Sequence, residues 1–282
     1  MKAIKGMTLT VWALCCLMAM GCERNGMDVR SCFNWDGPDI GTVADDSIWQ
    51  WMSDVICEHF DWTLLKTYDD MQTPPLDGPA LNHYYNQGIG HAVEEYGNEL
   101  NQRKGHKVVH AIYIDTLSFK VLCEDDCFIT YQAKEVNSMG DTHPMRYDSF
   151  VSFNKATGQR ITFGQLFAPE KRKDIVQRVF DKVDSLKQDF SPEMPKVIEY
   201  IDINKLDFSK VDADEYPRLA GISATSEFHF HNPAFTADGL LFYFYVDELS
   251  AYIEGQYNVV IPYTELTNEL LIHPVHLLQG FK

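Results

Sequence analysis

The chain has 282 residues, of which 45% are hydrophobic and 23% charged, and its formal net charge is −17. The length is enough for one large folded domain or two small ones. The acidic balance argues against a nucleic-acid partner and against a basic face that binds anionic lipid headgroups, whereas it is compatible with a cationic partner or with a role in solubility alone.

The first 21 residues have the pattern of a secretory signal. Lys2 and Lys5 precede an apolar run over residues 7–20, which is shorter than the roughly 20 apolar residues of a membrane-spanning helix. Gly21-Cys22 resembles a bacterial lipobox, although Ala19 replaces its usual leucine. We therefore expect an exported chain that begins at a lipidated Cys22, anchored to a membrane in the periplasm or at the cell surface. Without the signal lysines, 22 basic residues face 41 acidic ones, a net charge of −19.

Four cysteines remain after the signal and the lipidated residue are set aside, namely Cys32, Cys57, Cys123 and Cys127. An even number in an oxidising compartment predicts two disulfides. Cys123 and Cys127 flank the three residues 124–126, which we interpret as a hairpin loop, so these two are expected to pair across it and Cys32 to pair with Cys57. A four-cysteine zinc site is the alternative, but the usual paired spacing is absent.

The N-terminal half, residues 45–139, is predicted to combine helices and strands after a polar tether over residues 22–44. Asp46-Ser47 forms a helix-capping pair before apolar residues at helical spacing. A second helix is predicted from Gly78 to about residue 100, with Pro79 as its first helical residue. From Lys107 the apolar period changes to two, which predicts consecutive antiparallel strands.

The second half, residues 140–272, continues this pattern, and residues 273–282 are predicted to be a tail. A hairpin is predicted at Ala156-Thr157-Gly158, and a helix from near Pro169 that buries an apolar stripe. The stretch 191–221 has no clear period, and strands resume after it. Helices, then strands, a helix and more strands predict an α+β fold with an antiparallel sheet.

Three stretches in this half resemble, in order, one known family. GDTHP at 140–144, with the following SFVSFNKATGQRITFGQLF, is similar to the family's Gly-Gly-Ala-His-Pro-like turn and the strand after it. FTADGLLFYF is similar to its Asp-Gly-Leu-x-Phe hairpin, and DELSAYIEGQYNVVIPYTEL to the segment that ends in its Val-x-Ile-Pro-Tyr-x-x-Leu. The family is the C-terminal extracellular domain of the lysozyme-sensing anti-sigma-V factor, largely of unknown function and also found alone in exported lipoproteins of Bacteroidetes-like bacteria.

This resemblance implies a twisted antiparallel sheet with flanking helices. It also implies a non-enzymatic binding module, for cell-wall material such as peptidoglycan or for a cationic lysozyme-like protein, without a cofactor. The candidate ligand-binding residues are Asp141 and His143 in the first turn, and Glu248 and Tyr252 in the third stretch. Asp141 departs from the small residue that the family carries there, which bears on partner specificity. A structural or assembly lipoprotein of the envelope is an alternative.

EFHFHNP, at residues 227–233, gives a third hypothesis. On an extended chain His229 and His231 lie on one face, while Phe228 and Phe230 point into a core. Paired imidazoles are typical zinc ligands, so a metal-dependent hydrolase is an alternative function. A catalytic zinc needs a third protein ligand, and the sequence places none beside the pair, so we expect no metal.

Overall fold

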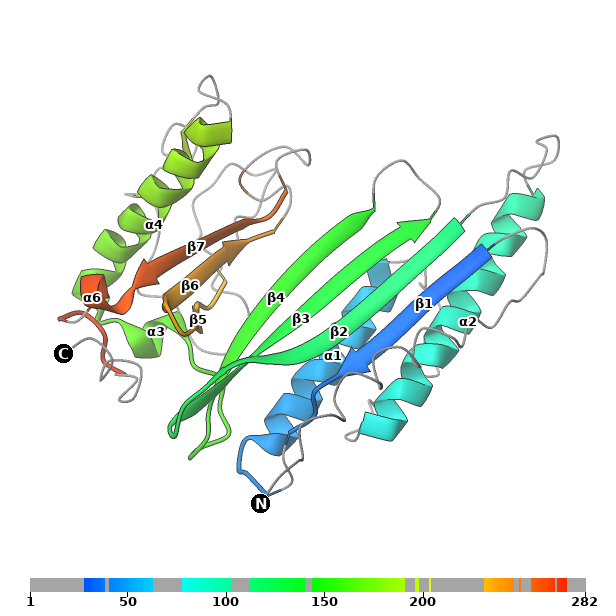
Figure 1. Cartoon of the computed structure of the whole chain (residues 1–282), viewed down its shortest axis with the longest axis horizontal. Helices are drawn as coiled ribbons and strands as arrows, with labels where there is room; N and C mark the ends of the chain where they lie inside the picture. The colour runs from blue at the N-terminus through cyan, green and yellow to red at the C-terminus, as the bar shows by residue number, and fades with distance from the viewer. Residues whose placement is uncertain are drawn as a thin grey trace, which may run out of the picture. The chain divides into compact units, whose positions relative to one another are not determined.

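The computed structural model describes residues 28–38, 41–62, 78–102, 112–139, 144–190, 196–197, 203, 231–245, 249, 255–266 and 268–272. The predicted signal, Cys22 and the tail at 273–282 lie outside these residues. The fold is α+β, as predicted, with a four-stranded and a three-stranded sheet and five helices among the described elements (Figure 1). None of the described helices is long and apolar enough to cross a membrane.

The described residues form two compact units. The first comprises those within 1–38, 48–120 and 133–146, and the second those within 39–47, 121–132 and 147–282. The predicted boundary between residues 139 and 140 is therefore not a boundary between these units. The reason is that the long strands β2 (Ile112–Glu124), β3 (Phe128–Met139) and β4 (Met145–Asn154) each contribute residues to both.

The larger sheet has the order β1-β2-β3-β4, and its first strand corrects the sequence analysis. β1, Asp28–Trp35, lies within the stretch that was expected to be a tether. It pairs in parallel with β2, from Asp28 opposite Ile112 to Trp35 opposite Phe119. The sheet is therefore mixed and not purely antiparallel. A single strand at a sheet edge is hard to recognise from the sequence, because its pairing is defined by a partner strand far along the chain.

Two helices of the first half were predicted close to their true bounds. α1 spans Asp45–Trp62 and α2 spans Gly78–Gln102, with Pro79 as the second residue of the helix. Figure 1 shows α1 passing behind β2 and β3. Buried apolar residues of both helices, among them Ile48, Met52 and Leu81, form the helical side of this core. A layer of aromatic rings joins them to the sheet, including Phe33 stacked on Tyr85 at 4.8 Å and Trp51 edge-on to Phe119 at 5.4 Å.

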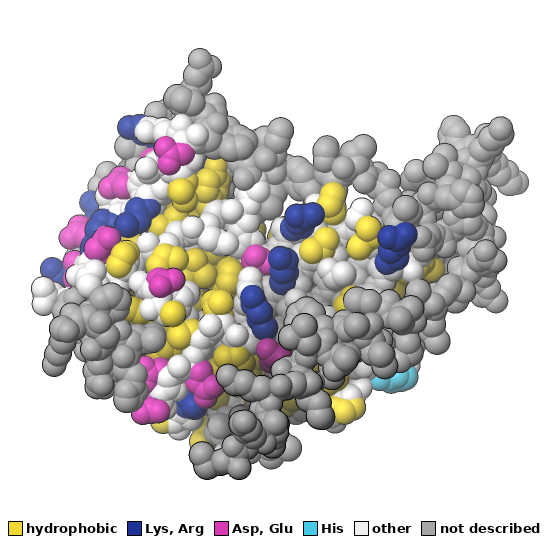
Figure 2. Space-filling model, viewed as in Figure 1, with side chains coloured by type: hydrophobic (Ala, Val, Ile, Leu, Met, Phe, Trp, Pro, Cys, Tyr) yellow, Lys and Arg dark blue, Asp and Glu magenta, His cyan; other side chains and the backbone are white. Residues whose placement is uncertain are grey.

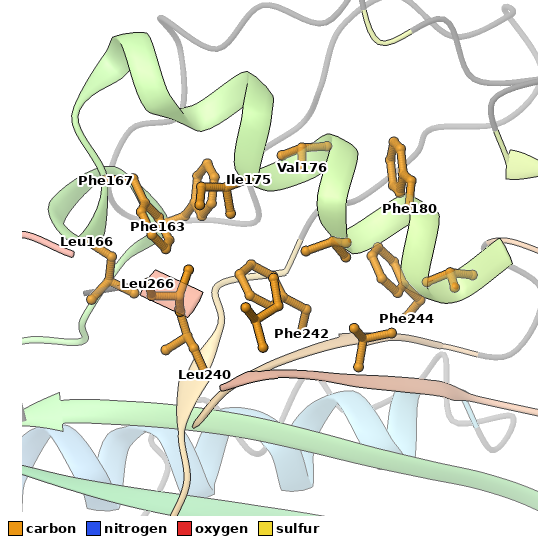
Figure 3. Close-up of a cluster of buried hydrophobic side chains, with 14 of the residues drawn as sticks. Phe163, Leu166, Phe167, Ile175, Val176, Phe180, Leu240, Phe242, Phe244 and Leu266 are labelled. Atoms are coloured by element: carbon orange, nitrogen blue, oxygen red, sulfur yellow. The ribbon is translucent and has the colours of Figure 1, made fainter. Parts of the chain in front are cut away.

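The second unit contains the helices α3 (Phe163–Leu166), α4 (Pro169–Phe190) and α6 (Tyr263–Leu266). Its smaller sheet is antiparallel, in the order β5 (Ala234–Phe235), β6 (Gly239–Phe244) and β7 (Tyr257–Pro262). The apolar stripe of α4 faces β6, where Ile175 and Phe180 approach Phe242 and Phe244 (Figure 3). All six residues of β6 are buried, which explains their continuous apolar run.

Turn chemistry fixes two hairpins in this unit. Gly158 has φ +71°, a left-handed conformation that favours glycine, in the predicted hairpin after β4. At Gly239 an added Cβ would lie 2.3 Å from the carbonyl oxygen of Ile261, so only glycine allows β6 to begin this close to β7. The glycine of the family-like Asp-Gly-Leu motif therefore has a packing reason.

Candidate functional site

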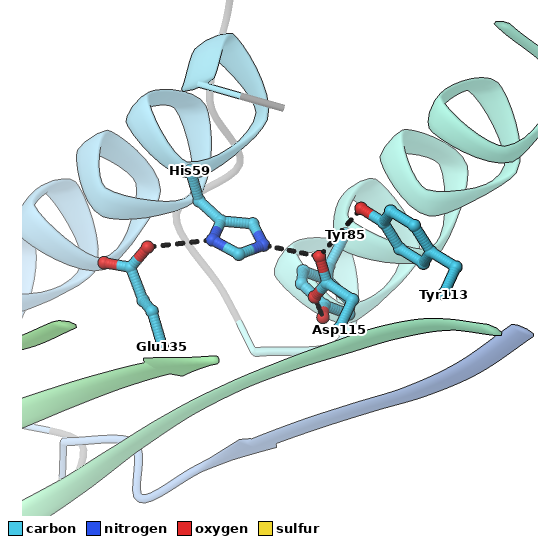
Figure 4. A network of polar contacts seen from close by, with 5 residues as sticks. All are labelled: His59, Tyr85, Tyr113, Asp115 and Glu135. Atoms are coloured by element: carbon cyan, nitrogen blue, oxygen red, sulfur yellow. Dashed lines mark hydrogen bonds and ion pairs between the residues drawn. The ribbon is translucent and has the colours of Figure 1, made fainter. Parts of the chain in front are cut away.

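A buried polar network in the first unit is the most concentrated group of titratable residues among those that the structure describes. His59 is the centre of the network, and its side chain is 3% exposed (Figure 4). It lies on the buried face of α1 because it follows Met52 by seven residues and Val55 by four. Asp115 on β2 and Glu135 on β3 point toward it from the sheet.

His59 makes a hydrogen bond through each ring nitrogen. Its Nε2 lies 2.7 Å from Asp115 Oδ2, and its Nδ1 lies 2.8 Å from Glu135 Oε2. An ionised carboxylate only accepts hydrogen bonds, and a neutral imidazole has only one N–H to donate. Two carboxylate partners therefore require the doubly protonated imidazolium, which carries one positive charge between two negative ones.

The pKa of His59 agrees with this charge state. Burial acts to lower it, but the hydrogen bonds from the ring to Asp115 and Glu135 and the charges of these carboxylates outweigh burial and raise the pKa to about 10. The imidazolium is thus the stable form throughout the neutral range. It has no free ring nitrogen with which to accept a proton, so His59 does not have the properties of a general base.

Two tyrosines complete the coordination of Asp115, which is fully buried. The Tyr85 hydroxyl on α2 donates to Oδ1, and the Tyr113 hydroxyl on β2 donates to Oδ2 at 3.2 Å. Burial raises the pKa of both tyrosines, and the Asp115 charge raises it further. With three donors, the carboxylate is well satisfied in an interior where an isolated charge would be costly. The network therefore ties α1 and α2 to β2 and β3.

The network also lacks the geometry of a metal centre. Its two carboxylates lie at opposite nitrogens of one imidazole and do not converge on a common point. Within the described ranges no group of three or more His, Cys, Asp or Glu side chains is arranged to hold a metal ion. The network is sealed, since His59 is 4% and Asp115 0% exposed. We interpret it as a structural clamp that holds the first unit together.

The surfaces on either side of this clamp carry opposite charges. Within the first unit, α1 over residues 48–62 and α2 each contain three acidic residues and no Lys or Arg. Of these, Glu58 and Glu94 are exposed and Asp54 is half-buried. We call this surface, defined by Asp54, Glu58 and Glu94, the acidic helical layer.

The face of the sheet turned away from the helices is basic. Asp115 and Glu135 point to the helices, so Lys120 and Lys134, which lie an odd number of residues from them on the same strands, point away. Arg30 lies opposite Ile114 and shares the face of Lys120. Arg146 on β4 lies on the same face as Lys134 on β3. The side chains of Thr130 and Ser152 hydrogen-bond across these two strands at 2.7 Å, and each of the two cations lies an even number of residues from the member of that pair on its own strand.

All four of these residues are exposed, and Figure 2 shows Lys and Arg side chains gathered over the strands. We call the surface formed by Arg30, Lys120, Lys134 and Arg146 the basic sheet face. Asp148, two residues after Arg146 on β4, lies at an alternating position of the same face, just within the second unit. The net charge of the whole chain is an average over surfaces of different sign.

Most of the predicted site residues cannot be compared with the structure. Asp141, His143, Glu248 and Tyr252, the four candidates for ligand binding, lie outside the described residues. The same is true of His229, Phe228 and Phe230.

His231, by contrast, is described and is buried in the second unit. Its ring stacks on Tyr243 with centroids 4.8 Å apart and lies edge-on to Tyr245 at 4.5 Å. His231 precedes β5 and packs among aromatic rings, so it is not an outward-facing histidine of a strand.

Among the described residues the structure contains neither predicted disulfide, and Cys32, Cys57, Cys123 and Cys127 are thiols. The β2–β3 turn gives the physical reason for one pair. β2 ends at Glu124, and the Asp125 amide donates to the Phe128 carbonyl at 2.9 Å. Cys127 therefore lies within the turn and not on a strand opposite Cys123. In the other predicted pair, Cys57 contacts the Tyr84 hydroxyl at 3.2 Å and Cys32 contacts the Asn34 side chain at 2.9 Å.

Comparison with known proteins finds one family model similar to part of the chain. Residues 166–264 match the model described as "Protein of unknown function (DUF3298)". These residues are similar to a DUF3298 domain. The match runs from the end of α3 through α4 and the small sheet into α6, within the range over which the motifs resemble the anti-sigma-V factor domain.

Two solved structures are similar to the chain. A DUF3298 family member from Bacteroides fragilis has a TM-score of 0.56 and 14% identity, covering 87% of this chain and 86% of that one. A DUF3298 family protein from Pseudomonas aeruginosa has a TM-score of 0.48 and 10% identity, covering 89% of each chain. No curated protein sequence matches the chain. At this identity, the similarity to the Bacteroides structure supports the fold alone.

Proposed function

We propose that this protein is an exported, lipid-anchored and non-enzymatic binding module that binds a cationic partner of the lysozyme type on its acidic helical layer. The observation that carries this proposal is the composition of α1 and α2 within the first unit, which have six acidic residues between them and no Lys or Arg. Such a one-sign surface attracts a basic protein and speeds its association.

The buried clamp supports a binding role for this surface. It anchors both helices to the sheet through His59 and Tyr85, so that the acidic residues are held on a rigid layer. Preorganisation of this kind lowers the entropy lost when a partner binds. The family resemblance supplies the partner class, either a lysozyme-like protein or peptidoglycan, and the charge favours the protein.

The test is retention of lysozyme and, separately, of insoluble peptidoglycan by the purified mature chain, each at low and high salt. We expect lysozyme to be retained at low salt and released at high salt, because salt screens contacts between exposed charges. A chain that retains neither material at low salt would overturn the proposal. Retention of peptidoglycan alone would reassign the ligand to the cell wall and exclude the acidic helical layer as its basis.

A matched pair of variants locates the site. The triple variant Asp54→Asn, Glu58→Gln, Glu94→Gln is expected to weaken lysozyme binding by about tenfold, the sum of three exposed charge contacts. The control variant, Glu170→Gln, Asp174→Asn, Asp189→Asn, removes three exposed acids from α4 in the second unit. It is expected to bind as the unmodified chain does. Equal losses in both variants would show that only net charge matters.

A further inference from the structure

The basic sheet face is suited to an anionic partner, whereas the protein as a whole is acidic. Four exposed cations, Arg30, Lys120, Lys134 and Arg146, are contributed one by each strand of the larger sheet. Between them lie the half-buried side chains of Thr116 and Ser118, which are small and polar. The four cations outnumber the acidic Asp148 of the same face, and their spread over four strands suits an extended anionic partner better than a single small anion.

The acidic helical layer, on the other side of the same unit, also favours an anionic surface as the partner of the basic sheet face. The acidic helical layer lies across the sheet from the basic sheet face, so the unit has a charge asymmetry between its two sides. Near an anionic surface, a body with this asymmetry is oriented with its basic side inward and its acidic side outward. An anionic membrane surface would therefore set the direction in which the acidic helical layer points.

The segment between the predicted lipid anchor and β1 is short enough to keep the basic sheet face near the membrane. Cys22, the predicted lipidation site, precedes Arg30 by eight residues. Because an extended chain spans at most about 3.5 Å per residue, the Cα atom of Arg30 lies within about 28 Å of the lipidated residue. The anchor therefore holds β1, and with it the basic sheet face, close to lipid headgroups at a high effective concentration.

We infer that the basic sheet face rests on the anionic phospholipid headgroups of the membrane that holds the Cys22 lipid, and so presents the acidic helical layer away from that membrane. The inference depends on the proposed function for its lipid anchor and assigns the opposite face of the same unit. A lipid anchor combined with a basic patch is a general route to stable membrane attachment.

Vesicle binding tests the face without the anchor. The full mature chain with Cys22→Ser is mixed with vesicles of phosphatidylcholine alone, or of an equimolar mixture of phosphatidylcholine and phosphatidylglycerol, and sedimented. We expect binding to the anionic vesicles only. Each neutralised base should weaken it by about fivefold, so that Arg30→Gln, Lys120→Gln, Lys134→Gln, Arg146→Gln together weaken it by a few hundredfold.

The matched control neutralises four bases of the second unit, Lys171→Gln, Lys173→Gln, Lys182→Gln and Lys196→Gln. It has the same net charge as the first quadruple variant and is expected to keep most of the binding. Circular dichroism confirms that both variants are folded. Equal binding to both kinds of vesicle, or equal loss in both variants, would overturn the inference.

Lysine acetylation tests the orientation in the lipidated protein. On anionic vesicles we expect Lys120 and Lys134 to be acetylated several-fold more slowly than on neutral ones, while Lys171 and Lys173 are acetylated at the same rate on both. Two other partners would give different results. Tight binding of soluble cell-wall fragments without vesicle binding, or concentration-dependent self-association that the first quadruple variant abolishes, would each overturn the inference.

These measurements separate the inference from the proposed function. Mass spectrometry of the native protein shows whether Cys22 is lipidated, and lysozyme retention tests the acidic helical layer. If a lipidated protein retains lysozyme but its Lys120 is acetylated equally on both kinds of vesicle, the proposed function stands and the inference of a membrane-facing sheet is overturned. If the native chain carries no lipid but still sediments with anionic vesicles through the four bases, the lipid anchor is rejected and the basic sheet face remains a membrane-binding surface.

Discussion

The imidazole of His59 and the carboxylate of Asp115 are 2.7 Å apart, and both side chains are almost completely shielded from solvent. Removing the cation by His59→Ala leaves Asp115 charged in the interior with only hydroxyl donors. We expect a loss of about 3–5 kcal/mol in the free energy of unfolding, the usual cost of breaking a buried ion pair from one side. Urea unfolding followed by circular dichroism measures it.

The exposed histidine His83 on α2 provides the control for that variant. His83→Ala is expected to change the free energy of unfolding by less than about 0.5 kcal/mol. If both alanine variants unfold at the same urea concentration, the His59 network does not stabilise the fold.

Stability should also depend on pH through His59. Its pKa is about 10 in the folded chain and about 6.5 when unfolded. Its stabilising contribution is therefore complete below pH 6.5 and is lost as the pH rises toward 10. Across this window the folded state holds one proton more than the unfolded state, so the free energy of unfolding should fall by up to about 1.4 kcal/mol per pH unit.

Other groups titrate in the same range, so the measurement is a difference. Urea midpoints of the unmodified chain and of His59→Gln are compared from pH 6 to 10, and the gap between them is expected to close as the pH rises. A gap that stays constant across this range would contradict the assignment of an imidazolium.

The two tyrosines on Asp115 should contribute unequally. Tyr85→Phe removes the closer hydroxyl donor from a buried carboxylate and is expected to cost about 1.5–3 kcal/mol, the range for hydrogen bonds to charged groups. Tyr113→Phe removes a donor at 3.2 Å and should cost less. Thermal or urea unfolding of the two single variants gives the order, and a larger loss for Tyr113→Phe would contradict the geometry.

Thiol labelling decides between the free thiols of the structure and the disulfide that the sequence suggested. Cys127 is exposed, whereas burial and the nearby Asp125 charge raise the pKa of Cys123 and lower its thiolate fraction. In the folded mature chain we expect a chromogenic disulfide reagent to modify Cys127 first and Cys123 more slowly. If neither residue reacts until a reductant is added, the two form a disulfide.

Regular local signals made much of the fold predictable. The helix after Asp46-Ser47 and the one beginning at Gly78-Pro79 combine a capping or proline signal with an apolar stripe, and both form close to the expected residues. The hairpin at Gly158 has a glycine that its backbone requires. β1 was missed because its pairing depends on β2, which lies far along the chain and leaves no local trace.

The clamp was not predicted, although the sequence held one signal. Asp115 alternates with Tyr113 and Leu117 on the buried face of an otherwise apolar strand, and a charge at such a position needs a buried partner. That partner is 56 residues away on a helix, so only the assembled unit identifies His59. The basic sheet face was missed for a related reason, since its four residues come from four strands and share a face only once the sheet order is known.

The parallel pairing of β1 with β2 also sets the order in which the chain can fold during synthesis. Asp28 pairs with Ile112 and Trp35 with Phe119, so every pair in this ladder joins residues 84 positions apart. At a typical 5–20 residues per second, β1 waits roughly 4–17 s for its partner to be made. During that time β1 has no partner strand, and the sheet cannot close until both helices have been synthesised.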